Sequence, residues 1–499
     1  MAERFDDIVV GSGVSGLTAA LLLGLNGRRV LVVEKAPEPG GSLKRFRRNG
    51  VDFDTGFHFT GGWGEHGLLQ GMLSALEIGD AVRPVFLSDE APFRFVFESE
   101  GRTLELPRGV PAARRKLKSV FPGETRAVDG YFDRLEKVCA GTATMNLRNI
   151  GLSSDRVEED FVSLREVLDG LTDNRLLKGV VSAFCMCYGA KPSEVSFANH
   201  SRVSLGLHER TVRIEDGGTG FIRAFQNRLK GLDVEVRCGR HIVQCVDIED
   251  QKAGRVVLNT GEEIGLENCI STVHPRETLN MLPREHLTKA FVNRVMSLEP
   301  SAGFFTVFGV LEDGRRDAEA SAAIVSLYPT TDFDAMLDPA REGDSALIIV
   351  ESDGREGDRP VRTLTAFEPS FPEHVAPWKD STVKHRPPGY AEYKSRRTAR
   401  IRERLAAFRP EYRDGLRVLD AASLLTFRDY LHSPDGSAYG VKQKLGQISL
   451  LGKLPIRNVY AAGQSSLLPG VLGAMMSSFI VCRAVIGKDQ LSRFVSRRT

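Results

Sequence analysis

The sequence predicts an α/β protein in which a Rossmann-like domain is interleaved with a second domain of α+β structure. Residues 7–34 are predicted to form a strand, a glycine-rich turn, a helix and a second strand, the smallest unit of a parallel sheet. Further strand-and-helix stretches occur within 211–275 and 421–499, and two long segments separate these blocks. Since 499 residues are enough for two or three domains, we expect the separating segments to form the second domain.

The N-terminal unit carries the most specific motif of the chain. An apolar strand at 8–10 leads through Gly11-x-Gly13-x-x-Gly16 into a helix, and the second strand ends on Glu34, eighteen residues after Gly16. In such units the first glycine permits a tight turn, the second lets the backbone approach a pyrophosphate, and the third lets helix and strand pack closely. The helix N-terminus favours phosphate, and a carboxylate such as that of Glu34 accepts hydrogen bonds from ribose hydroxyls. We therefore expect a bound dinucleotide without a 2′-phosphate, which the carboxylate would repel.

A second glycine-bearing stretch lies near the C-terminus, where no charged side chain occurs from Asn458 to Cys482. A membrane-spanning helix needs roughly 20 unbroken apolar residues. Here Gln464 and Pro469 interrupt the run. The pattern instead predicts a strand in "NVYAAG", a turn, and a buried helix that begins near Gly473.

Composition argues against several classes of function. The 67 basic and 65 acidic residues nearly cancel, so nothing in the overall charge points to nucleic acid as a partner. The seven cysteines are scattered and include no C-x-x-C pair, which argues against a disulfide framework or a structural metal site. Because a strand begins within a few residues of Met1, we expect no signal peptide and a cytoplasmic location.

Four further stretches resemble the flavoprotein superfamily of amine oxidases, phytoene desaturases and Rab GDP-dissociation inhibitors. They are "KAPEPGGSLK" with its glycine pair, "FDTGFHF", "DGGTGFIRAFQNRLKGLDVEVRCGRHIVQCVDIED" and "NCISTVHP". The resemblance implies a Rossmann-like domain of the GR2 type that binds FAD. It divides the chain into an FAD-binding domain at 1–61, 211–275 and 421–499 and a substrate-binding domain at 62–210 and 276–420.

The resemblance also implies which residues bind FAD. The glycine-pair loop lies along the pyrophosphate, the main chain of Val243 pairs with adenine, and the C-terminal stretch completes the site from the other end of the chain. The helix near Gly473 aims its N-terminus at the pyrimidine edge of the flavin, where a helix N-terminus stabilises the negative charge of the reduced ring. The implied FAD-binding residues are Gly11, Ser12, Gly13, Val14, Ser15, Gly16, Glu34, Lys35, Gly40, Gly41, Ser42, Gly56, His58, Val243, Gly463, Gln464, Gly470, Val471, Leu472, Gly473 and Ala474.

The chain has no second Gly-x-Gly-x-x-Gly between a strand and a helix, which a reductase using NAD(P)H would need. We therefore expect electrons to pass between the flavin and a partner without its own nucleotide domain. A quinone, oxygen and a carrier protein are the alternatives.

Two stretches resemble one branch of the superfamily, the retinol saturases and their bacterial relatives. They are "CYGAKPSEVSFANHSRV" at 187–203 and "LTFRDYLHSPDGSAYGVKQ" at 425–443. Gln464 replaces an acidic residue common in the superfamily, as it does in the saturases. One departure is "VRIEDGG", where the branch usually has Tyr-Pro before the glycine pair, and it puts the saturases' own substrate in doubt.

The branch implies an FAD-dependent oxidoreductase that acts on carbon–carbon bonds of a hydrophobic isoprenoid or polyene, either as a saturase or as a desaturase. A redox-neutral carotenoid cis–trans isomerase fits the same motifs, and an amine oxidase fits them less well. A prenyl-binding escort protein is the alternative from another class, although the intact Gly11, Gly13, Gly16 and Glu34 argue for bound flavin.

His58 and Tyr439 are the predicted proton donors of such a reaction. His58 follows the loop that approaches the flavin and would titrate near neutral pH, although a histidine bonded to backbone beneath the cofactor is an equal alternative. Tyr188 and His200 are expected to be scaffold. The apolar stretch at 301–311 is expected to line a substrate tunnel, and a hydrophobic substrate makes peripheral membrane contact an open alternative.

Overall fold

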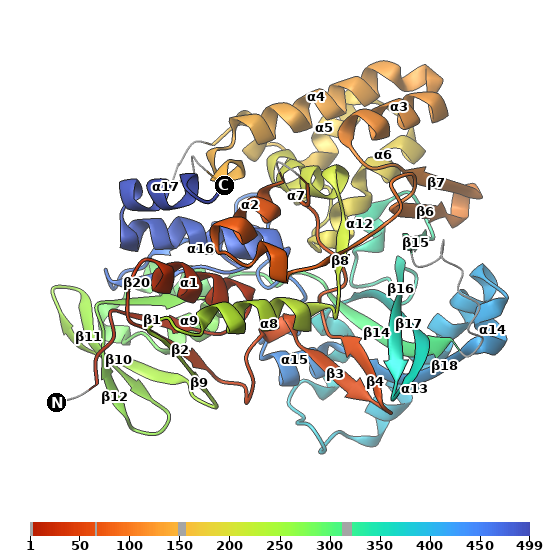
Figure 1. Cartoon of the computed structure of the whole chain (residues 1–499). Coiled ribbons are helices and arrows are strands. Elements are labelled where there is room, and N and C mark those ends of the chain that lie inside the picture. Colours follow the sequence, from red (N-terminus) through yellow and green to blue (C-terminus); the bar gives the residue numbers. More distant parts are fainter. Residues whose placement is uncertain (1–2, 65–66, 148–155, 312–321) are drawn as a thin grey trace.

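The computed structural model describes residues 3–64, 67–147, 156–311 and 322–499. Apart from residues 1–2, the residues outside this description fall within the predicted insertions at 62–210 and 276–420. The chain folds into two interleaved domains, each built on its own large sheet (Figure 1).

The first sheet draws its strands from three distant parts of the sequence. Its order is β19-β20-β13-β1-β2-β9, parallel except for β19 at one edge. The strands are β1 (Asp7–Val10), β2 (Val30–Glu34), β9 (Val234–Cys238), β13 (Asn268–Ser271), β19 (Gly452–Lys453) and β20 (Val459–Ala461). The apolar runs in β1, β2 and β20 are explained by their complete burial between two layers. This sheet confirms the predicted Rossmann-like domain.

Helices cover one face of this sheet and a small antiparallel sheet lies on the other (Figure 1). The helices are α1 (Val14–Leu25), α2 (Leu68–Ala75), α8 (Gly218–Leu229), α16 (Gly470–Ile486) and α17 (Lys488–Ser496). On the opposite face lie β10 (Ile242–Glu249), β11 (Lys252–Leu258), β12 (Glu263–Gly265), α9 (Pro275–Asn280) and α10 (Lys289–Met296). Both faces of the parallel sheet are therefore buried.

The second sheet has nine strands, with the main order β18-β14-β17-β16-β15-β6-β7 and the hairpin β3–β4 attached to β16. Its strands are β3 (Arg45–Arg48), β4 (Val51–Asp54), β6 (Phe93–Phe97), β7 (Arg102–Leu106), β14 (Gly303–Leu311), β15 (Ile324–Tyr328), β16 (Leu347–Glu356), β17 (Arg359–Ser370) and β18 (Leu416–Ala422). The hairpin comes from the segment predicted as part of the FAD-binding domain, so the two domains share this stretch of chain. A separate pair, β5 (Pro84–Phe86) and β8 (Val212–Ile214), lies between them.

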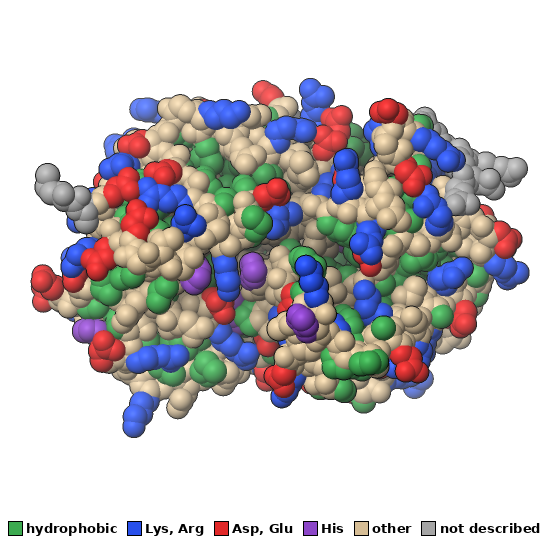
Figure 2. All heavy atoms as spheres, turned by 90° about the horizontal axis from the view of Figure 1, so that it is seen from below, with side chains coloured by type: hydrophobic (Ala, Val, Ile, Leu, Met, Phe, Trp, Pro, Cys, Tyr) green, Lys and Arg blue, Asp and Glu red, His purple; other side chains and the backbone are tan. Residues whose placement is uncertain are grey.

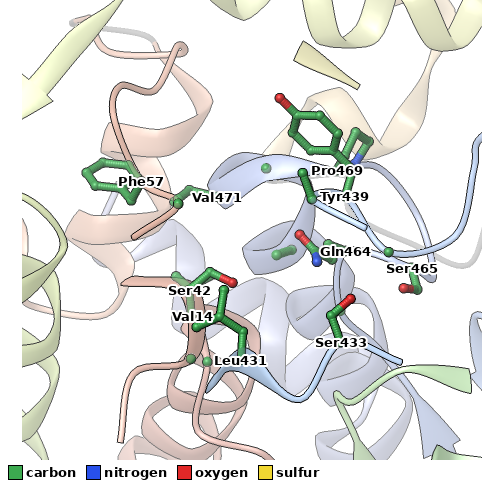
Figure 3. Close-up of a pocket in the computed structure, with 18 of the residues that line it drawn as sticks. Val14, Ser42, Phe57, Leu431, Ser433, Tyr439, Gln464, Ser465, Pro469 and Val471 are labelled. Atoms are coloured by element: carbon green, nitrogen blue, oxygen red, sulfur yellow. The ribbon is translucent and has the colours of Figure 1, made fainter. Parts of the chain in front are cut away.

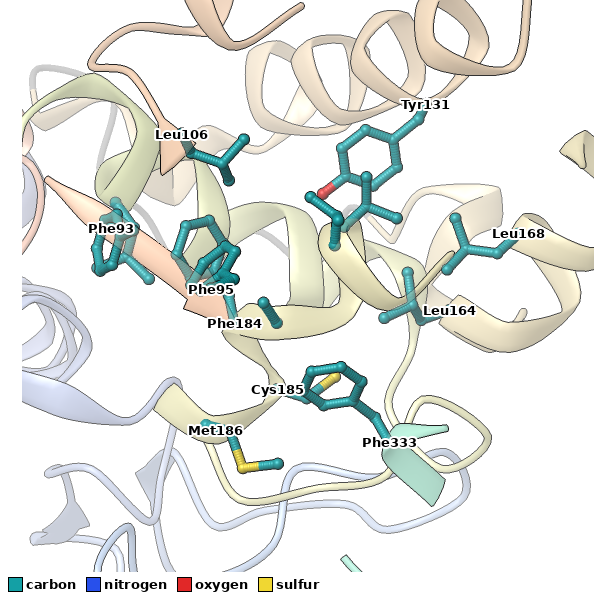
Figure 4. Close-up of a cluster of buried hydrophobic side chains, with 14 of the residues drawn as sticks. Phe93, Phe95, Leu106, Tyr131, Leu164, Leu168, Phe184, Cys185, Met186 and Phe333 are labelled. Atoms are coloured by element: carbon teal, nitrogen blue, oxygen red, sulfur yellow. The ribbon is translucent and has the colours of Figure 1, made fainter. Parts of the chain in front are cut away.

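Helices also lie on both sides of the second sheet. One side carries α13 (Pro388–Phe408), α14 (Glu411–Gly415) and α15 (Leu424–Leu431). The other carries α3 (Val110–Val120), α4 (Thr125–Gly141), α5 (Leu164–Leu171), α6 (Arg175–Ser182), α7 (Phe197–Glu209) and the short α12 (Phe333–Met336). Figure 4 shows Phe93 and Phe95 of β6 in one apolar cluster with Phe184 and with side chains of α4 and α5.

The uncharged C-terminal stretch forms β20 and α16, as predicted, but α16 begins at Gly470 and not near Gly473. Pro469 is its N-cap, and Gly470 has a φ of 75°, a backbone conformation that favours glycine. The helix lies beside α1, where the Ser478 and Ser15 hydroxyls are 2.6 Å apart. Within the described ranges, no helix is long and apolar enough to cross a membrane.

Candidate functional site: a cavity between the two domains

A cavity of about 680 Å³ lies where the two domains meet. Figure 3 shows part of its wall, which combines residues near the N-terminus, such as Val14 and Ser42, with C-terminal residues such as Gln464 and Val471. In Figure 2 the surface is hollowed near its centre, and lysine, arginine and histidine side chains gather at the rim of the hollow. Of the predicted FAD-binding residues, all but Gly16 and Gly40 line the cavity, and Tyr439 lines it as well.

The glycines of the first turn occupy three different environments. Gly11 has a φ of 91°, a backbone conformation that L side chains rarely adopt. A Cβ atom on Gly16 would lie 1.9 Å from the Gly11 carbonyl oxygen, so Gly16 is required for packing of α1 against β1. A Cβ atom on Gly13 would meet nothing within 4 Å, because this position faces the open cavity. Each environment agrees with the role predicted for that glycine in dinucleotide binding.

Glu34 ends β2 and is held in place by the first turn. One carboxylate oxygen accepts hydrogen bonds from the Ser12 amide at 2.8 Å and the Ser12 hydroxyl at 2.5 Å, and the other accepts from the Ala36 amide at 2.7 Å. A carboxylate has about four lone-pair positions, so Glu34 retains acceptor capacity on the side that lines the cavity. This geometry suits an acceptor for ribose hydroxyls.

The glycine pair lies against the first turn. A Cβ atom on Gly41 would approach Gly13 Cα to 3.1 Å, and the Gly40 amide donates to the Ser12 carbonyl at 3.0 Å. Gly40 itself packs on Ile222 of α8 and has a φ of 125°, which explains why it does not line the cavity. The two loops therefore form one continuous wall, as the resemblance implies.

Val243 lies at an irregularity in β10. The pairing with β11 shifts between Ile242 and Gln244, so Val243 opposes no residue of the partner strand in the ladder. Its side chain is exposed and it lines the cavity. A bulge of this kind leaves main-chain groups outside the ladder, where a purine base can bond with them.

Two helix N-termini face the cavity. Val14 and Ser15 begin α1, and Gly470 and Val471 begin α16; all four line the cavity. Helix N-termini carry partial positive charge and free N–H groups, which favour anions. The two ends therefore offer one anion site at the glycine turn and a second at the start of α16.

Sequence reasoning missed the segment 431–433, which also lines the cavity. Figure 3 shows Leu431 on the wall near Val14 and Ser42. His432 ends α15 in a left-handed conformation with a φ of 54°. An ion pair of 3.2 Å between Arg276 and Asp435 ties this segment to α9. The turn residues in "LHSPDG" predict a loop, but no signal in the sequence connects it with the first glycine turn.

His58 lines the cavity with its ring stacked on Phe367, the two ring centres 5.1 Å apart. Neither ring nitrogen is hydrogen-bonded to another described residue. Burial, together with the positive charge of Arg213, lowers the pKa of the imidazole to about 4. The expectation that His58 titrates near neutral pH therefore differs from the structure, in which the neutral imidazole is the form present at pH 7.

Tyr439 has its hydroxyl already engaged. It donates to the Met186 carbonyl at 2.9 Å, and burial raises the pKa of the phenol well above its usual value. The ring packs edge-on against Phe304. A hydroxyl held by a backbone carbonyl is poorly placed to donate elsewhere, so this geometry favours a positioning role.

Tyr188 and His200 belong to the scaffold, as expected. The two ring nitrogens of His200 are each 2.8 Å from a hydroxyl, one from Tyr131 and the other from Tyr188. Both His200 and Tyr188 are almost completely buried. Burial lowers the pKa of His200 to about 3, so the network joins neutral groups in the core between α4 and α7.

The buried histidines predict a loss of stability in mild acid. An unfolded histidine has a pKa of about 6.5, whereas that of His58 is lowered to about 4. The unfolded chain therefore takes up the proton first, and this contribution to stability is present above pH 6.5 and is lost as the pH falls towards 4. We expect the free energy of unfolding, measured with urea, to fall over this range, and to fall less steeply in His58→Gln. His200 and His208 also have lowered pKa values, so the variant should still lose some stability over this range. A variant whose stability falls as steeply as that of wild type would contradict the lowered pKa of His58.

The half of the cavity that lies over the second sheet is an apolar chamber. Its wall is formed by Phe93, Phe95, Phe184, Leu207, Phe304, Ile324, Ile348 and Phe367. Among the described residues around this chamber the charged one is Arg202, and its guanidinium is paired with both oxygens of Asp160 at 2.6 and 3.0 Å. The predicted tunnel strand contributes Phe304 and Thr306. The chamber therefore suits a neutral, hydrophobic molecule.

The fold and the site together define a protein with a Rossmann-like nucleotide-binding domain and a second domain built on its own sheet. Residues 9–76 match the family described as the NAD(P)-binding Rossmann-like domain. The chain is 26% identical over 537 residues to an all-trans-retinol 13,14-reductase of Danio rerio, covering 97% of this chain and 86% of the relative. It is 25% identical over 300 residues to prolycopene isomerase 2 of an Oncidium hybrid cultivar, covering 56% and 50%. These relatives confirm the resemblance predicted from the sequence.

Solved structures agree on the fold. An oxidoreductase from Methanosarcina mazei superposes with a TM-score of 0.64 at 15% identity, covering 95% of this chain and 98% of that one. Putrescine oxidase bound to putrescine superposes with a TM-score of 0.61 at 14% identity, covering each chain completely. At this identity the likeness extends to the fold alone.

Proposed function

We propose that the protein is an FAD-dependent oxidoreductase that acts on a carbon–carbon double bond of a neutral isoprenoid or polyene. One observation carries the proposal: a single cavity joins a dinucleotide-binding wall to an apolar chamber whose lining is uncharged apart from the paired Arg202. The relatives named reductase and isomerase of retinol and prolycopene support the same class of substrate. Putrescine is a diamine, and the described residues around the chamber include no carboxylate to bind it, which disfavours an amine oxidase.

The residues present fit FAD. The open space before Gly13 suits the pyrophosphate, Glu34 suits a ribose without a 2′-phosphate, and the bulge at Val243 suits adenine. The first turn of α16 suits the flavin end, because a helix N-terminus stabilises negative charge. Bound FAD would supply hydride transfer at its N5 atom, the step that no side chain can perform.

The protein's own residues would orient the substrate, exclude water and supply a proton. The aromatic and aliphatic chamber excludes water, and Phe367 beneath His58 fixes one side of the ring. His58 is neutral near pH 7, so it can accept a proton from a carbon directly; it donates one through its imidazolium form, which is a minor species at that pH. Tyr439 holds the loop at Met186 in place and thereby shapes the wall next to the chamber.

Replacing His58 and Tyr439 separately distinguishes these roles. We expect His58→Gln to slow the reoxidation of reduced flavin by substrate roughly 100-fold or more, since a positioned general acid or base contributes at least that much. We expect Tyr439→Phe to slow it less than tenfold, because the lost hydroxyl bonds to backbone and not to substrate. Stopped-flow absorbance of the flavin under anaerobic conditions measures both rates. Equal rates in His58→Gln and wild type would remove His58 from the reaction.

The proposed reaction is tested by a single turnover without oxygen. The flavin is reduced photochemically, a polyene is added, and flavin absorbance and product mass are recorded. Reoxidation with a mass gain of two hydrogens is the expected result for a reductase. A cis–trans shift without reoxidation would instead assign the protein to the redox-neutral isomerases, the second function that the relatives support. Failure to bind any flavin would overturn both and favour a prenyl-binding escort.

The single dinucleotide motif limits the electron partner, and the proposed substrate bears on the cellular location. We propose a donor or acceptor without a pyridine nucleotide, such as a quinone, oxygen or a carrier protein. A polyene dissolves in lipid and not in water, which is why we propose a cytoplasmic protein that contacts membranes from outside. Incubation with liposomes followed by flotation tests this contact.

A further inference from the structure

The loop that follows α15, residues 431–437, forms a side of the cavity that the proposed cofactor contacts do not use. Figure 3 shows two of its residues, Leu431 and Ser433, on the cavity wall. At the same time His432 is exposed to solvent. The loop therefore separates the cavity from solvent. Five of its seven residues line the cavity: Leu431, His432, Ser433, Gly436 and Ser437.

This loop runs along the dinucleotide wall. At its start, His432 interacts electrostatically with Lys35 and Glu34, at the proposed ribose end. Just past its end, a Cβ atom on Gly440 would lie 2.1 Å from the Ser465 hydroxyl oxygen, in the C-terminal stretch proposed for the flavin end. Because both ends of the loop lie beside this wall, a dinucleotide bound along the wall would lie beneath the loop.

One ion pair fastens the middle of the loop to the dinucleotide-binding domain. The guanidinium of Arg276, on α9, is 3.2 Å from Asp435 Oδ1. Among the hydrogen bonds and ion pairs of the described residues, this pair alone joins 431–437 to that domain. Within the loop, the Ser433 hydroxyl donates to the Ser437 carbonyl at 3.1 Å, so the loop is internally braced. The pair at Asp435 is therefore the point at which the loop can come free.

This ion pair belongs to a cluster whose polar atoms are incompletely partnered. Asp435 Oδ2, Arg276 Nε and His274 Nε2 are buried and have no hydrogen-bond partner among the described residues. His274 Nδ1 accepts from the Arg276 amide at 3.3 Å, so in the neutral ring the proton is on Nε2. A buried polar atom without a partner costs free energy, which bonding to water returns. Opening of the loop would expose the cluster to water, so the closed form is held only marginally.

We infer that residues 431–437 are a further part of the cofactor-binding site: they cover the bound dinucleotide, and the Arg276–Asp435 pair latches this cover. FAD then enters and leaves only when the latch opens. The inference rests on the proposed function, because it takes the dinucleotide to be FAD. It goes beyond that function in assigning cofactor exchange to a loop of the second domain.

The rates of FAD exchange distinguish a cover from an ordinary wall. Release is measured by diluting holoprotein into excess ADP, which prevents rebinding, and following FAD fluorescence. Entry is measured by stopped-flow mixing of apoprotein with FAD. In Asp435→Ala we expect both rates to rise about tenfold, as loss of a charge-assisted hydrogen bond would give, and the dissociation constant to change less than about threefold. Arg276→Ala should behave alike, and the double variant should exchange FAD no faster than either single variant.

Asp334→Ala is the matched control. Asp334 also forms an ion pair of 3.2 Å and is similarly buried, but its partner is Arg165, and the pair joins α12 to α5 in the second domain. We expect wild-type exchange rates in this control, and thermal melts establish that each variant is folded. Wild-type rates in Asp435→Ala and Arg276→Ala, or faster release with unchanged entry, would overturn the inference alone. Failure of wild type to bind FAD would overturn the proposed function with it.

Discussion

Gly13→Asp is expected to abolish FAD binding while leaving the fold of the apoprotein intact. The backbone at Gly13, with φ −63° and ψ 179°, is an ordinary extended conformation, and a Cβ atom there would meet nothing within 4 Å. The new carboxylate would occupy the space proposed for the pyrophosphate, at the N-terminus of α1. Two unit charges 4 Å apart interact by roughly 4 kcal/mol near a protein surface, so the affinity should fall by about a thousandfold.

Titration of apoprotein with FAD, followed by flavin fluorescence, measures the affinity, and circular dichroism measures the melting temperature. Gly123→Asp is the matched control, because Gly123 lies in an exposed turn where an added Cβ atom also meets nothing within 4 Å. We expect the control to bind FAD as wild type does. Unchanged affinity in Gly13→Asp would show that the pyrophosphate does not lie at the first glycine turn.

Gly16→Ala, three residues further on, is expected to disrupt both folding and binding. Its methyl group would lie 1.9 Å from the Gly11 carbonyl oxygen and 2.9 Å from the carbonyl carbon, both backbone atoms. The backbone at Gly11 cannot shift easily, because it already has a positive φ and packs against Val273. Overpacking of this kind costs roughly 1–3 kcal/mol or more, and relief would require α1 to move away from β1 and from the pyrophosphate.

The free energy of unfolding from urea titration should therefore fall by at least about 2 kcal/mol, and purified Gly16→Ala should lack flavin. Gly170→Ala in α5 is the control: its methyl group would meet nothing within 4 Å. There the better helix propensity of alanine should raise stability by up to about 1 kcal/mol. Wild-type stability of Gly16→Ala would contradict the close contact between helix and turn.

The sequence was sufficient to predict the dinucleotide wall, because local geometry leaves a local signal. Position 11 has a positive φ, position 16 lies in close contact with the Gly11 carbonyl, and position 34 ends a strand. Each of these requirements fixes a residue type, and the spacing between the three positions is set by the strand–turn–helix–strand unit. The start of α16 was misplaced by three residues. Glycine disfavours the helix interior, but Gly470 stands at the helix start with a φ of 75°, a backbone conformation that favours glycine.

The chamber and its chemistry could not be predicted in this way. Phe93, Ile348 and Phe367 meet only through the register of the second sheet, which no short motif encodes. The lowered pKa of His58 depends on burial and on Arg213 from β8. The partner of Tyr439 is a backbone carbonyl, that of Met186, so no residue type marks it in the sequence.

The central claim is that one cavity brings a flavin dinucleotide and a neutral polyene together. A crystal structure of the holoprotein with a bound polyene tests it most directly. We predict adenine at Val243, pyrophosphate at Gly13, the isoalloxazine beside the first turn of α16, and the polyene between it and Phe367. A dinucleotide bound elsewhere, or a polyene outside the chamber, would contradict the account.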